Sequence, residues 1–515
     1  MTRRQVLTHA AAGMAAGALE LTGGPTGSLL DRAAAAGNEE NTRMIAERAD
    51  NWAEMRGKEG YFRVARENSN RWWLLDPVGK PFFYRGVCAI NRAGTQGGRF
   101  AVPGPYAEAV DRKYRYHEQG PDAFVEATLK RLRAWGFNAL GAWTTVEFFD
   151  RGMPYTEILE FSKVGPNLRD GGGENAPRGP RLPDVFSPVW ELEGDRLARE
   201  LCAPRRMSRN LIGYFTDNEI GWAQPKGMDR DDNPETTPPP TTPTLLQYCL
   251  ALEPEWAAHQ AAWKFARERH SGDIARALSA WECDARNVED FVRFHRGGGV
   301  LSNNAYREDH IAFSEQFAER YFAGVSRAIR RYDPNHLILG CRFGGPPGVT
   351  ILRAARPPFV DILSANNYQH AFQERLEFYH EPTRMPILNG EFAWASGYFT
   401  DLMIPGEPAE EWSGRERAQQ KAAPALRSGA AHPALVGYTW YRWVSRAAAP
   451  DGVTYGLVDL EDNEDTFNTR LLAQVNPTLE AVHRAGTSEP VPGIEQPWKL
   501  SPKKEAEIQA RKKKS

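Results

Sequence analysis

Two glutamates are the residues best placed to do chemistry in this chain. Glu219 ends the segment Leu211-Ile-Gly-Tyr-Phe-Thr-Asp-Asn-Glu219, and Glu391 ends Pro386-Ile-Leu-Asn-Gly-Glu391. Each follows a short apolar run that turns polar, which is typical of the carboxyl end of a buried parallel strand. In a (β/α)8 barrel these ends form the active-site rim. Two carboxyl groups on one rim could hydrolyse a glycosidic bond, because one can protonate the leaving oxygen while the other attacks the sugar or activates water.

Each glutamate could instead cap the helix that follows its strand, where the helix dipole favours a carboxylate. One isolated glutamate in this setting would favour capping. The presence of two, each with polar neighbours at a strand end, favours catalysis.

Eight apolar runs are predicted as strands, and amphipathic stretches separate most of them, as expected for βα units around a parallel sheet. They span residues 82–88, 137–143, 155–161, 211–216, 336–342, 359–365, 386–389 and 435–440. Eight strands close an α/β barrel of the (β/α)8 type and place the glutamates at the ends of strands four and seven. An open doubly wound sheet would carry a glycine-rich phosphate turn after an early strand, and none follows the first strand here.

The chain is predicted to have four successive parts. Residues 1–37 are typical of a twin-arginine signal segment, with Arg3-Arg4 before an Ala/Gly-rich stretch, and predict export to the periplasm or the outside of the cell. Residues 38–71 are predicted to be a helical and polar lead-in, 72–486 the catalytic barrel, and 487–515 a polar, basic and solvated tail.

Two features are predicted within the barrel region. A hairpin turns at Asp76-Pro-Val-Gly79. Residues 223 to about 305 form an insertion between strands four and five, which includes a Pro/Thr-rich run at 238–243. We expect the insertion to be a lid or a substrate wall, because long ordered connections tend to be functional.

Composition limits the possible partners and cofactors. The formal net charge of −2 gives no electrostatic case for nucleic acid or an anionic membrane, and no segment beyond the leader has the apolar length of a membrane span. The five cysteines are scattered without a Cys-x-x-Cys pair, and the 11 histidines form no zinc-binding motif. We therefore expect no metal and no cofactor, and buried free thiols at Cys88 and Cys341.

Taken together, these motifs resemble the clan A retaining glycoside hydrolases, and within them the β-agarase group (family 50), with weaker similarity to β-galactosidase groups. The similar pieces are Asn218-Glu219, Gly390-Glu391, the segment Gly213–Trp222 and the opening Trp73–Phe83. They occur in the same order over residues 72–484. The resemblance implies that Glu219 is the acid/base and Glu391 the nucleophile of a double-displacement reaction on a β-linked poly- or oligosaccharide.

Further residues are expected to bind the substrate or to support the two glutamates. Asn218 is suited to the sugar 2-hydroxyl, and Arg342 and Tyr368 are suitable hydrogen-bond donors to Glu391. Three tryptophans are candidate sugar platforms: by its position in the clan Trp440 is expected to stack on the sugar, whereas Trp143 and Trp394 could equally belong to the core. Asn91, after strand one, and Asn366 and Asn367, after strand six, could contact a hydroxyl, although an ordinary loop contact is equally expected for each. The side chains expected to bury Glu219 partly, and so to keep it protonated, are Tyr214, Phe215 and Trp222.

Two other functions are compatible with a barrel of this kind. A non-catalytic carbohydrate-binding barrel would have no reason to keep an acid beside a nucleophile. A metal-dependent hydrolase would need clustered histidine and aspartate ligands. The paired glutamates favour a glycoside hydrolase that acts on a carbohydrate substrate.

Overall fold

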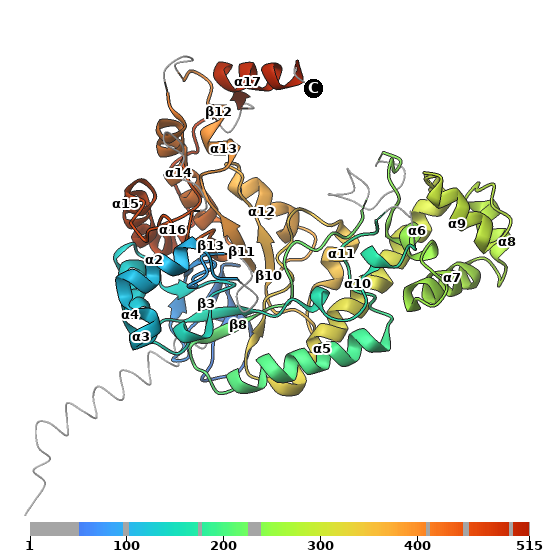
Figure 1. Cartoon of the computed structure of the whole chain (residues 1–515), viewed down its shortest axis with the longest axis horizontal. Coiled ribbons are helices and arrows are strands. Elements are labelled where there is room, and N and C mark those ends of the chain that lie inside the picture. The colour runs from blue at the N-terminus through green and yellow to red at the C-terminus, as the bar shows by residue number, and fades with distance from the viewer. Residues whose placement is uncertain are drawn as a thin grey trace, which may run out of the picture. The chain divides into compact units, whose positions relative to one another are not determined.

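A computed structural model describes residues 51–95, 102–173, 178–224, 238–407, 412–445, 453–493 and 498–513. The predicted signal segment and residues 38–50 of the predicted lead-in lie outside these residues, as does part of the insertion. The compact unit Ala53–Ser515 is built around one parallel sheet with helices outside it (Figure 1).

Eight parallel strands form this sheet, and they confirm the predicted (β/α)8 architecture. In chain order they are β5 (Tyr84–Val87), β6 (Ala139–Leu140), β7 (Tyr155–Ile158), β8 (Leu211–Phe215), β9 (Leu337–Ile338), β10 (Leu363–Asn366), β11 (Ile387–Phe392) and β13 (Leu435–Trp440). Every predicted run contains or overlaps one of them. Almost every residue of these strands is buried, because a parallel strand covered on both faces has no side left for water.

The sheet closes into a barrel through backbone hydrogen bonds between the segments of β9 and β10, its two outermost strands. The ladder runs β10-β11-β13-β5-β6-β7-β8-β9. At one end of the gap between β9 and β10, Asp361 N donates to Ile338 O at 2.9 Å, and at the other Phe343 N donates to Ser364 O at 2.9 Å. A closed parallel sheet brings the carboxyl ends of all eight strands to one rim.

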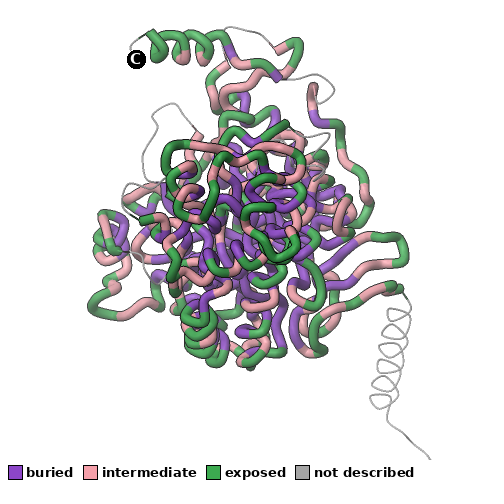
Figure 2. Tube along the Cα trace, turned by 90° about the vertical axis from the view of Figure 1, so that its right-hand side faces the viewer, coloured by how far each residue is buried: buried purple, intermediate pink, exposed green. Residues whose placement is uncertain are grey.

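Helices surround the barrel, and their buried residues recur every three or four positions. Apart from the helices of the insertion and of the carboxyl-terminal segment, they are α2 (Pro105–Tyr114), α3 (Tyr116–Gln119), α4 (Asp122–Ala134), α5 (Pro188–Leu201), α10 (Asn304–Tyr332), α11 (Val349–Ala354), α12 (Phe372–His380), α13 (Gly397–Thr400), α14 (Gly414–Ala431), α15 (Thr466–Val475) and α16 (Leu479–Ala485). In α4, for example, the buried positions are Phe124, Val125, Thr128, Leu129 and Leu132. The buried residues gather at the centre of the Cα trace in Figure 2.

The described part of the predicted insertion between strands four and five is mainly helical. It contains α6 (Leu245–Leu250), α7 (Ala257–Arg269), α8 (Ile274–Ala280) and α9 (Val288–Arg296), drawn in green in Figure 1. The buried carboxylate of Asp309 in α10 accepts hydrogen bonds from His270 at 2.7 Å and from the Trp281 indole at 2.8 Å, which fixes the ends of α7 and α8. Residues 238–243, the described part of the Pro/Thr-rich run, form no helix or strand.

The lead-in prediction is wrong for the residues that can be compared. β1 (Trp52–Arg56) and β2 (Arg63–Glu67) lie where a helix was expected, and they join β3 (Trp72–Leu75) and β4 (Pro81–Phe82) in a four-stranded sheet. In β1 intermediate and exposed side chains alternate. An edge strand that buries so little has a polar sequence, so the sequence did not predict a strand here. The predicted hairpin is confirmed, since β3 and β4 pair antiparallel and Gly79 N donates to Asp76 O at 2.9 Å.

The carboxyl-terminal segment is more ordered than a solvated tail. β14 (Lys499–Leu500) pairs antiparallel with β12 (Leu402–Met403), and α17 (Pro502–Lys512) follows at the surface. Trp498 is 7% exposed, and its ring stacks on His370 with 3.4 Å between the ring centroids. Burial of this tryptophan anchors the segment, although its basic composition predicted a solvated tail.

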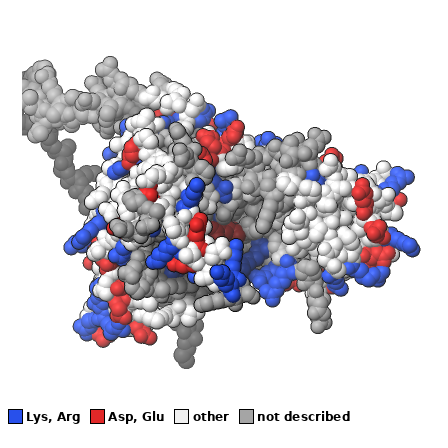
Figure 3. Space-filling model, turned by 90° about the horizontal axis from the view of Figure 1, so that it is seen from above, with Lys and Arg blue, Asp and Glu red and all other residues white. Residues whose placement is uncertain are grey.

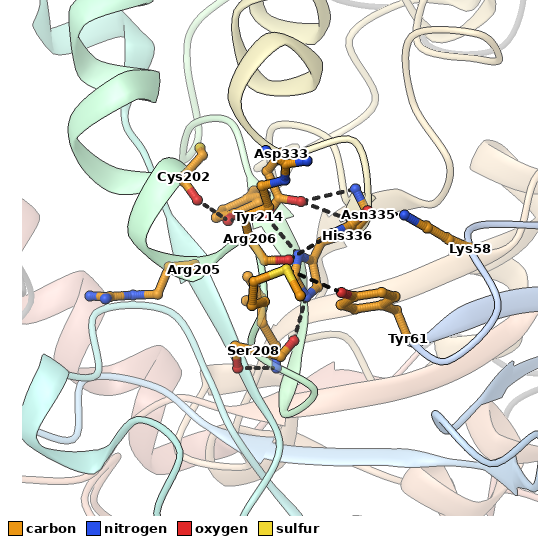
Figure 4. Close-up of polar contacts among 12 residues, drawn as sticks. Lys58, Tyr61, Cys202, Arg205, Arg206, Ser208, Tyr214, Asp333, Asn335 and His336 are labelled. Atoms are coloured by element: carbon orange, nitrogen blue, oxygen red, sulfur yellow. Dashed lines mark hydrogen bonds and ion pairs between the residues drawn. The ribbon is translucent and has the colours of Figure 1, made fainter. Parts of the chain in front are cut away.

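A buried polar cluster lies at the end of the barrel opposite the rim (Figure 4). The Asp333 carboxylate contacts His336 Nδ1 at 2.6 Å and accepts the Tyr214 hydroxyl at 2.6 Å, while His336 Nε2 contacts Ser208 O at 2.6 Å. Burial by itself raises the pKa of Asp333, but the contacts with His336 and Tyr214 outweigh it and lower that pKa below its ordinary value. The cluster joins the start of β9 to β8.

Two observations bear on the remaining expectations. Cys88 and Cys341 are buried and carry free thiols, as predicted. Within the described ranges, no helix has both the length and the apolar character needed to cross a membrane.

Candidate active site

Strand β8 delivers Asn218 and Glu219 to the rim. Glu219 N donates to Arg342 O at 3.1 Å, so the backbone pairing between β8 and the β9 segment continues past both strands. Just before the pair, the buried Asp217 carboxylate accepts hydrogen bonds from Ser162 N at 2.9 Å and from the Tyr321 hydroxyl at 2.6 Å. Burial raises the pKa of Asp217 to about 7. These bonds fix the direction in which Asn218 and Glu219 leave the strand.

Strand β11 delivers Glu391, which is only 4% exposed. The neighbouring residue is Gly390, and the side chain of Asn366 approaches its Cα closely. A Cβ at this position would lie 2.6 Å from Asn366 Oδ1 and 3.4 Å from Arg342 Cγ. A side chain at position 390 would therefore push against the Asn366 amide oxygen, whereas Arg342 would stay at an ordinary van der Waals distance. The Asn-Gly-Glu sequence thus gives the neighbouring strand room to place its polar side chains beside the carboxylate.

One guanidinium connects the two motifs. Arg342 is fully buried, and its Nε donates to Asn218 Oδ1 at 2.8 Å while its Nη2 donates to Glu391 Oε1 at 2.7 Å. The rings of Trp143 and Phe215 lie 4.7 Å and 4.9 Å from the guanidinium carbon. Held between two rings and two polar partners, Arg342 fixes the relative positions of the ends of strands four and seven.

Strand β10 supplies two more donors. Asn366 Nδ2 donates to Glu219 Oε1 at 2.9 Å and lies 3.2 Å from Asn218 Oδ1. The Tyr368 hydroxyl donates to Glu391 Oε2. The structure therefore brings Glu219, Glu391, Asn218, Arg342 and Tyr368 together, and Asn366, one of the candidates after strand six, links Asn218 and Glu219.

The electrostatic environment of Glu391 combines opposing effects. Burial raises its pKa, the Arg342 charge lowers it, the Glu219 charge raises it, and the bonds from Tyr368 and Arg342 lower it, with a net pKa above the ordinary value. The two carboxyl groups are also connected by geometry, because Arg342 bonds Glu391 and Asn218, and Asn366 bonds Asn218 and Glu219. Burial raises the pKa of the neighbouring Cys88 thiol to about 11, so this group stays neutral beside Arg342.

Glu219 differs from expectation in its surroundings, because its side chain is exposed. The Tyr214 hydroxyl donates to Asp333, just before β9 begins, and Figure 4 shows these two side chains together. Phe215 faces Arg342, and Trp222 packs on Phe322 with 5.8 Å between ring centroids. Adjacent residues on a strand or turn point in different directions, so closeness in sequence did not bring these rings to the carboxyl group.

The three candidate tryptophan platforms are buried. Trp440 and Trp394 are 0% exposed and meet edge to face with 4.6 Å between centroids, and Trp143 is 3% exposed. Contrary to expectation, Trp440 offers no open ring face to a sugar in this structure. Trp143 instead stacks on Arg342, and its indole lies 3.4 Å from Glu160 Oε1.

The two remaining predicted residues lie near the site but bond to backbone. Asn91 is 1% exposed, and its Nδ2 donates to Thr95 O at 2.8 Å and to Trp143 O at 3.1 Å, which orders the loop after β5. Asn367 Oδ1 accepts from Gln369 N at 3.0 Å, and its backbone N donates to Glu391 O at 3.1 Å. Of the two asparagines that end strand six, Asn366 rather than Asn367 reaches the carboxyl groups.

Several residues of the same rim have a strained backbone, and one of them, Glu160, was not a candidate from the sequence. Positive φ angles occur at Trp143 (61°), Glu160 (64°), Glu219 (49°) and Arg342 (51°), which follow strands two to five. Such conformations are costly for residues other than glycine and tend to gather at functional sites. Glu160, after β7, is 6% exposed and pairs with Lys163. No local sequence pattern distinguishes it from an ordinary loop glutamate.

Basic and acidic side chains are interspersed on the face shown in Figure 3, in keeping with the formal net charge of −2. Among the described residues of this face, neither sign predominates in a way that would favour a highly charged ligand. The polar groups described above suit a neutral substrate rich in hydroxyls, because they combine carboxylate acceptors with amide, phenol and guanidinium donors.

Comparison with known proteins gives relatives in both sequence and fold. No protein-family model matches the chain. The chain is 26% identical over 486 residues to "Beta-agarase A" of Vibrio sp. (strain JT0107), covering 81% of this chain and 45% of that protein. It is 24% identical over 368 residues to "Beta-agarase B" of the same strain, covering 69% and 36%. The chain therefore spans less than half the length of these curated relatives.

Two solved structures show the same fold. One, described as an exo-β-agarase, superimposes with a TM-score of 0.60 at 20% identity and covers 83% of this chain and 66% of its own. Another agarase gives a TM-score of 0.62 at 21% identity, with coverage of 86% and 70%. The chain thus resembles the β-agarases in sequence and shares the (β/α)8 fold of their solved structures.

Proposed function

We propose that this protein is a retaining β-glycoside hydrolase, with Glu219 as acid/base and Glu391 as nucleophile. The observation that carries the proposal is the pair of bonds from Arg342, which ties the Asn218-Glu219 end of strand four to Glu391 on strand seven. The link through Asn366 to Glu219 supports the same arrangement. Retention requires two carboxyl groups about 5–5.5 Å apart, on opposite sides of the scissile bond.

In the first step Glu219 gives its proton to the glycosidic oxygen as the bond from that oxygen to the anomeric carbon breaks. Asn366 donates to one oxygen of Glu219, which leaves the other oxygen to carry the proton. A Glu391 oxygen forms an ester bond to the same carbon. Arg342 and Tyr368 donate to Glu391, and so favour the ionised form that attacks.

In the second step water replaces the enzyme at the anomeric carbon. Glu219, now ionised, takes a proton from the water, and the hydroxyl oxygen bonds to the carbon as the Glu391 ester breaks. Two inversions give net retention, and both carboxyl groups return to their starting forms. In this scheme Asn218, which Arg342 holds, bonds the sugar 2-hydroxyl, an interaction that strengthens in the transition state.

The substrate class follows from the named relatives. Both sequence relatives are called β-agarases, so agarose and the oligosaccharides derived from it are the first substrates to test. The Arg3-Arg4 motif favours export, which would place the enzyme where a polysaccharide can reach it. We further propose that the helical insertion forms one wall of the substrate site. No cofactor takes part in this chemistry.

The roles of the two glutamates can be tested separately. Glu391→Ala and Glu219→Ala should each lose most activity on agarose oligosaccharides and on aryl β-galactosides. Azide should rescue both with a good leaving group, giving an α-glycosyl azide from Glu391→Ala and a β-glycosyl azide from Glu219→Ala. Glu160→Ala is the matched control, because it removes another carboxylate of the rim and azide should restore nothing.

Two results would contradict the proposal. Near-wild-type rates in both variants would remove the glutamates from the reaction. Binding of oligosaccharides without turnover over a broad panel of glycans would instead favour a carbohydrate-binding barrel.

A further inference from the structure

An exposed tyrosine lies beside the nucleophile. The Tyr455 side chain is 39% exposed, although the tryptophans of the rim are buried. Its ring meets the rings of Tyr368 and Tyr441 edge to face, with 6.2 Å and 6.0 Å between centroids. Since Tyr368 bonds Glu391 directly, Tyr455 is one aromatic ring away from the reacting carboxylate.

Electrostatics agree with this placement. Burial of its hydroxyl raises the pKa of Tyr455, and the charge of Glu391 raises it further. Tyr455 is thus partly enclosed and lies where the Glu391 charge acts on its hydroxyl, while 39% of the residue stays exposed.

The turn that carries Tyr455 is held on both sides. Asn468 Nδ2 donates to Thr454 O and to Gly456 O, each at 2.8 Å. The Thr454 hydroxyl donates to Asp465 at 2.8 Å, and Gly456 N donates to the Ser445 hydroxyl at 2.9 Å. A side chain on a turn with this many bonds is pre-organised, so little conformational entropy is lost when a ligand packs on it.

The two buried tryptophans at the rim complete this support. Trp440 Nε1 donates to Tyr455 O at 2.9 Å, and Trp394 Nε1 donates to Asn468 Oδ1 at 2.8 Å. An indole has a single hydrogen-bond donor. Trp440 donates it directly to the Tyr455 turn, and Trp394 donates it to Asn468, which holds the turn. Both residues, at the ends of strands seven and eight, are fully buried and connected to the Tyr455 turn by these bonds.

We propose that Tyr455, with Tyr441 at its edge, is the aromatic platform on which a pyranose ring of the substrate packs its C–H face, and that Trp440 and Trp394 are positioning residues for it. The inference rests on the proposed glycosidase function and deepens it. A carbohydrate ring has an apolar C–H face that packs on an aromatic face, whereas its hydroxyls bind the polar groups nearby.

The test compares ring and hydroxyl at position 455. Tyr455→Ala should raise KM for agarose oligosaccharides roughly tenfold, equivalent to about 1.4 kcal/mol, with a smaller change in kcat. Tyr455→Phe keeps the ring and should stay within about twofold of wild type. Tyr398→Ala is the matched control, because Tyr398 is 38% exposed and its ring lies on His370 instead. It should leave KM unchanged.

The role of Trp440 has its own readout. Trp440→Phe removes the indole donor to Tyr455 O while keeping an aromatic ring. It should raise KM in the wild-type background and have little further effect in Tyr455→Ala. A KM increase of equal size in both backgrounds would show that Trp440 does not act through Tyr455.

Failure of the platform can be distinguished from failure of the function. If wild type hydrolyses the oligosaccharides but Tyr455→Ala has the same KM, or Tyr455→Phe is as impaired as Tyr455→Ala, the platform is wrong and the glycosidase function stands. If wild type hydrolyses nothing, calorimetric titration of the same oligosaccharides still tests the platform. A Kd that is the same in wild type and Tyr455→Ala, both folded by thermal melting, would overturn it.

Discussion

Replacing Tyr368 with phenylalanine removes a hydrogen-bond donor to Glu391 and keeps the ring that packs on Tyr441 and Tyr455. The phenol stays neutral, because burial and the Glu391 charge raise its pKa well above 10. A hydrogen bond to a charged group contributes about 1.5–3 kcal/mol, and one pKa unit corresponds to about 1.36 kcal/mol. Because Tyr368 favours the ionised carboxylate, its loss raises the pKa of Glu391.

The acidic limb of the pH profile reports this change. Only ionised Glu391 can attack, so activity falls as the pH drops through its pKa. In Tyr368→Phe the acidic limb of kcat/KM should move upward by about 1–2 pH units. Tyr398→Phe removes a hydroxyl with no contact to Glu391 and should leave the limb in place. An unmoved limb, or one displaced to lower pH, would refute the assignment of Tyr368 as a donor to an ionised nucleophile.

Three further substitutions test other contacts. Arg342→Gln breaks a buried ion pair with Glu391, so thermal or chemical unfolding should show a loss of about 3–5 kcal/mol, and the acidic limb should again move upward. Asn366→Ala removes the donor to Glu219, and steady-state assays should show kcat/KM lower by about 10- to 150-fold, with unfolding little changed. Asp333→Asn, far from the rim, should lower the free energy of unfolding by about 3–5 kcal/mol at pH 7 with normal KM. Because the pKa of Asp333 is lowered by folding, that difference should shrink as the pH falls below about 4, and a constant difference would contradict the pairing.

The barrel strands could be predicted because burial on both faces leaves a direct trace in sequence. A run such as Leu211–Phe215 is apolar throughout and ends in polar residues, so both its place and its direction can be inferred. The same rule misses β1 (Trp52–Arg56), since an edge strand buries few of its side chains. It also misses Trp498, whose burial depends on His370, far away in the chain.

Within the site, residue type and strand position predicted Arg342 and Tyr368 as donors. Side-chain direction at the last residues of a strand was harder to predict, because a change of one position reverses it. Thus Asn366 rather than Asn367 reaches Glu219, and Glu219 is exposed although three aromatic residues lie near it in sequence. Tyr455 follows no strand, and its turn is positioned by bonds from distant residues.

The most direct measurement traps the proposed covalent intermediate. An activated 2-deoxy-2-fluoro-β-galactoside slows both steps, and its good leaving group lets the ester form faster than water can break it. After protease digestion, mass spectrometry should find one fluorosugar on the peptide that contains Glu391, with none in Glu391→Ala and release accelerated by a sugar acceptor. A label on another residue, or turnover of the reagent with inversion and no label, would contradict the account.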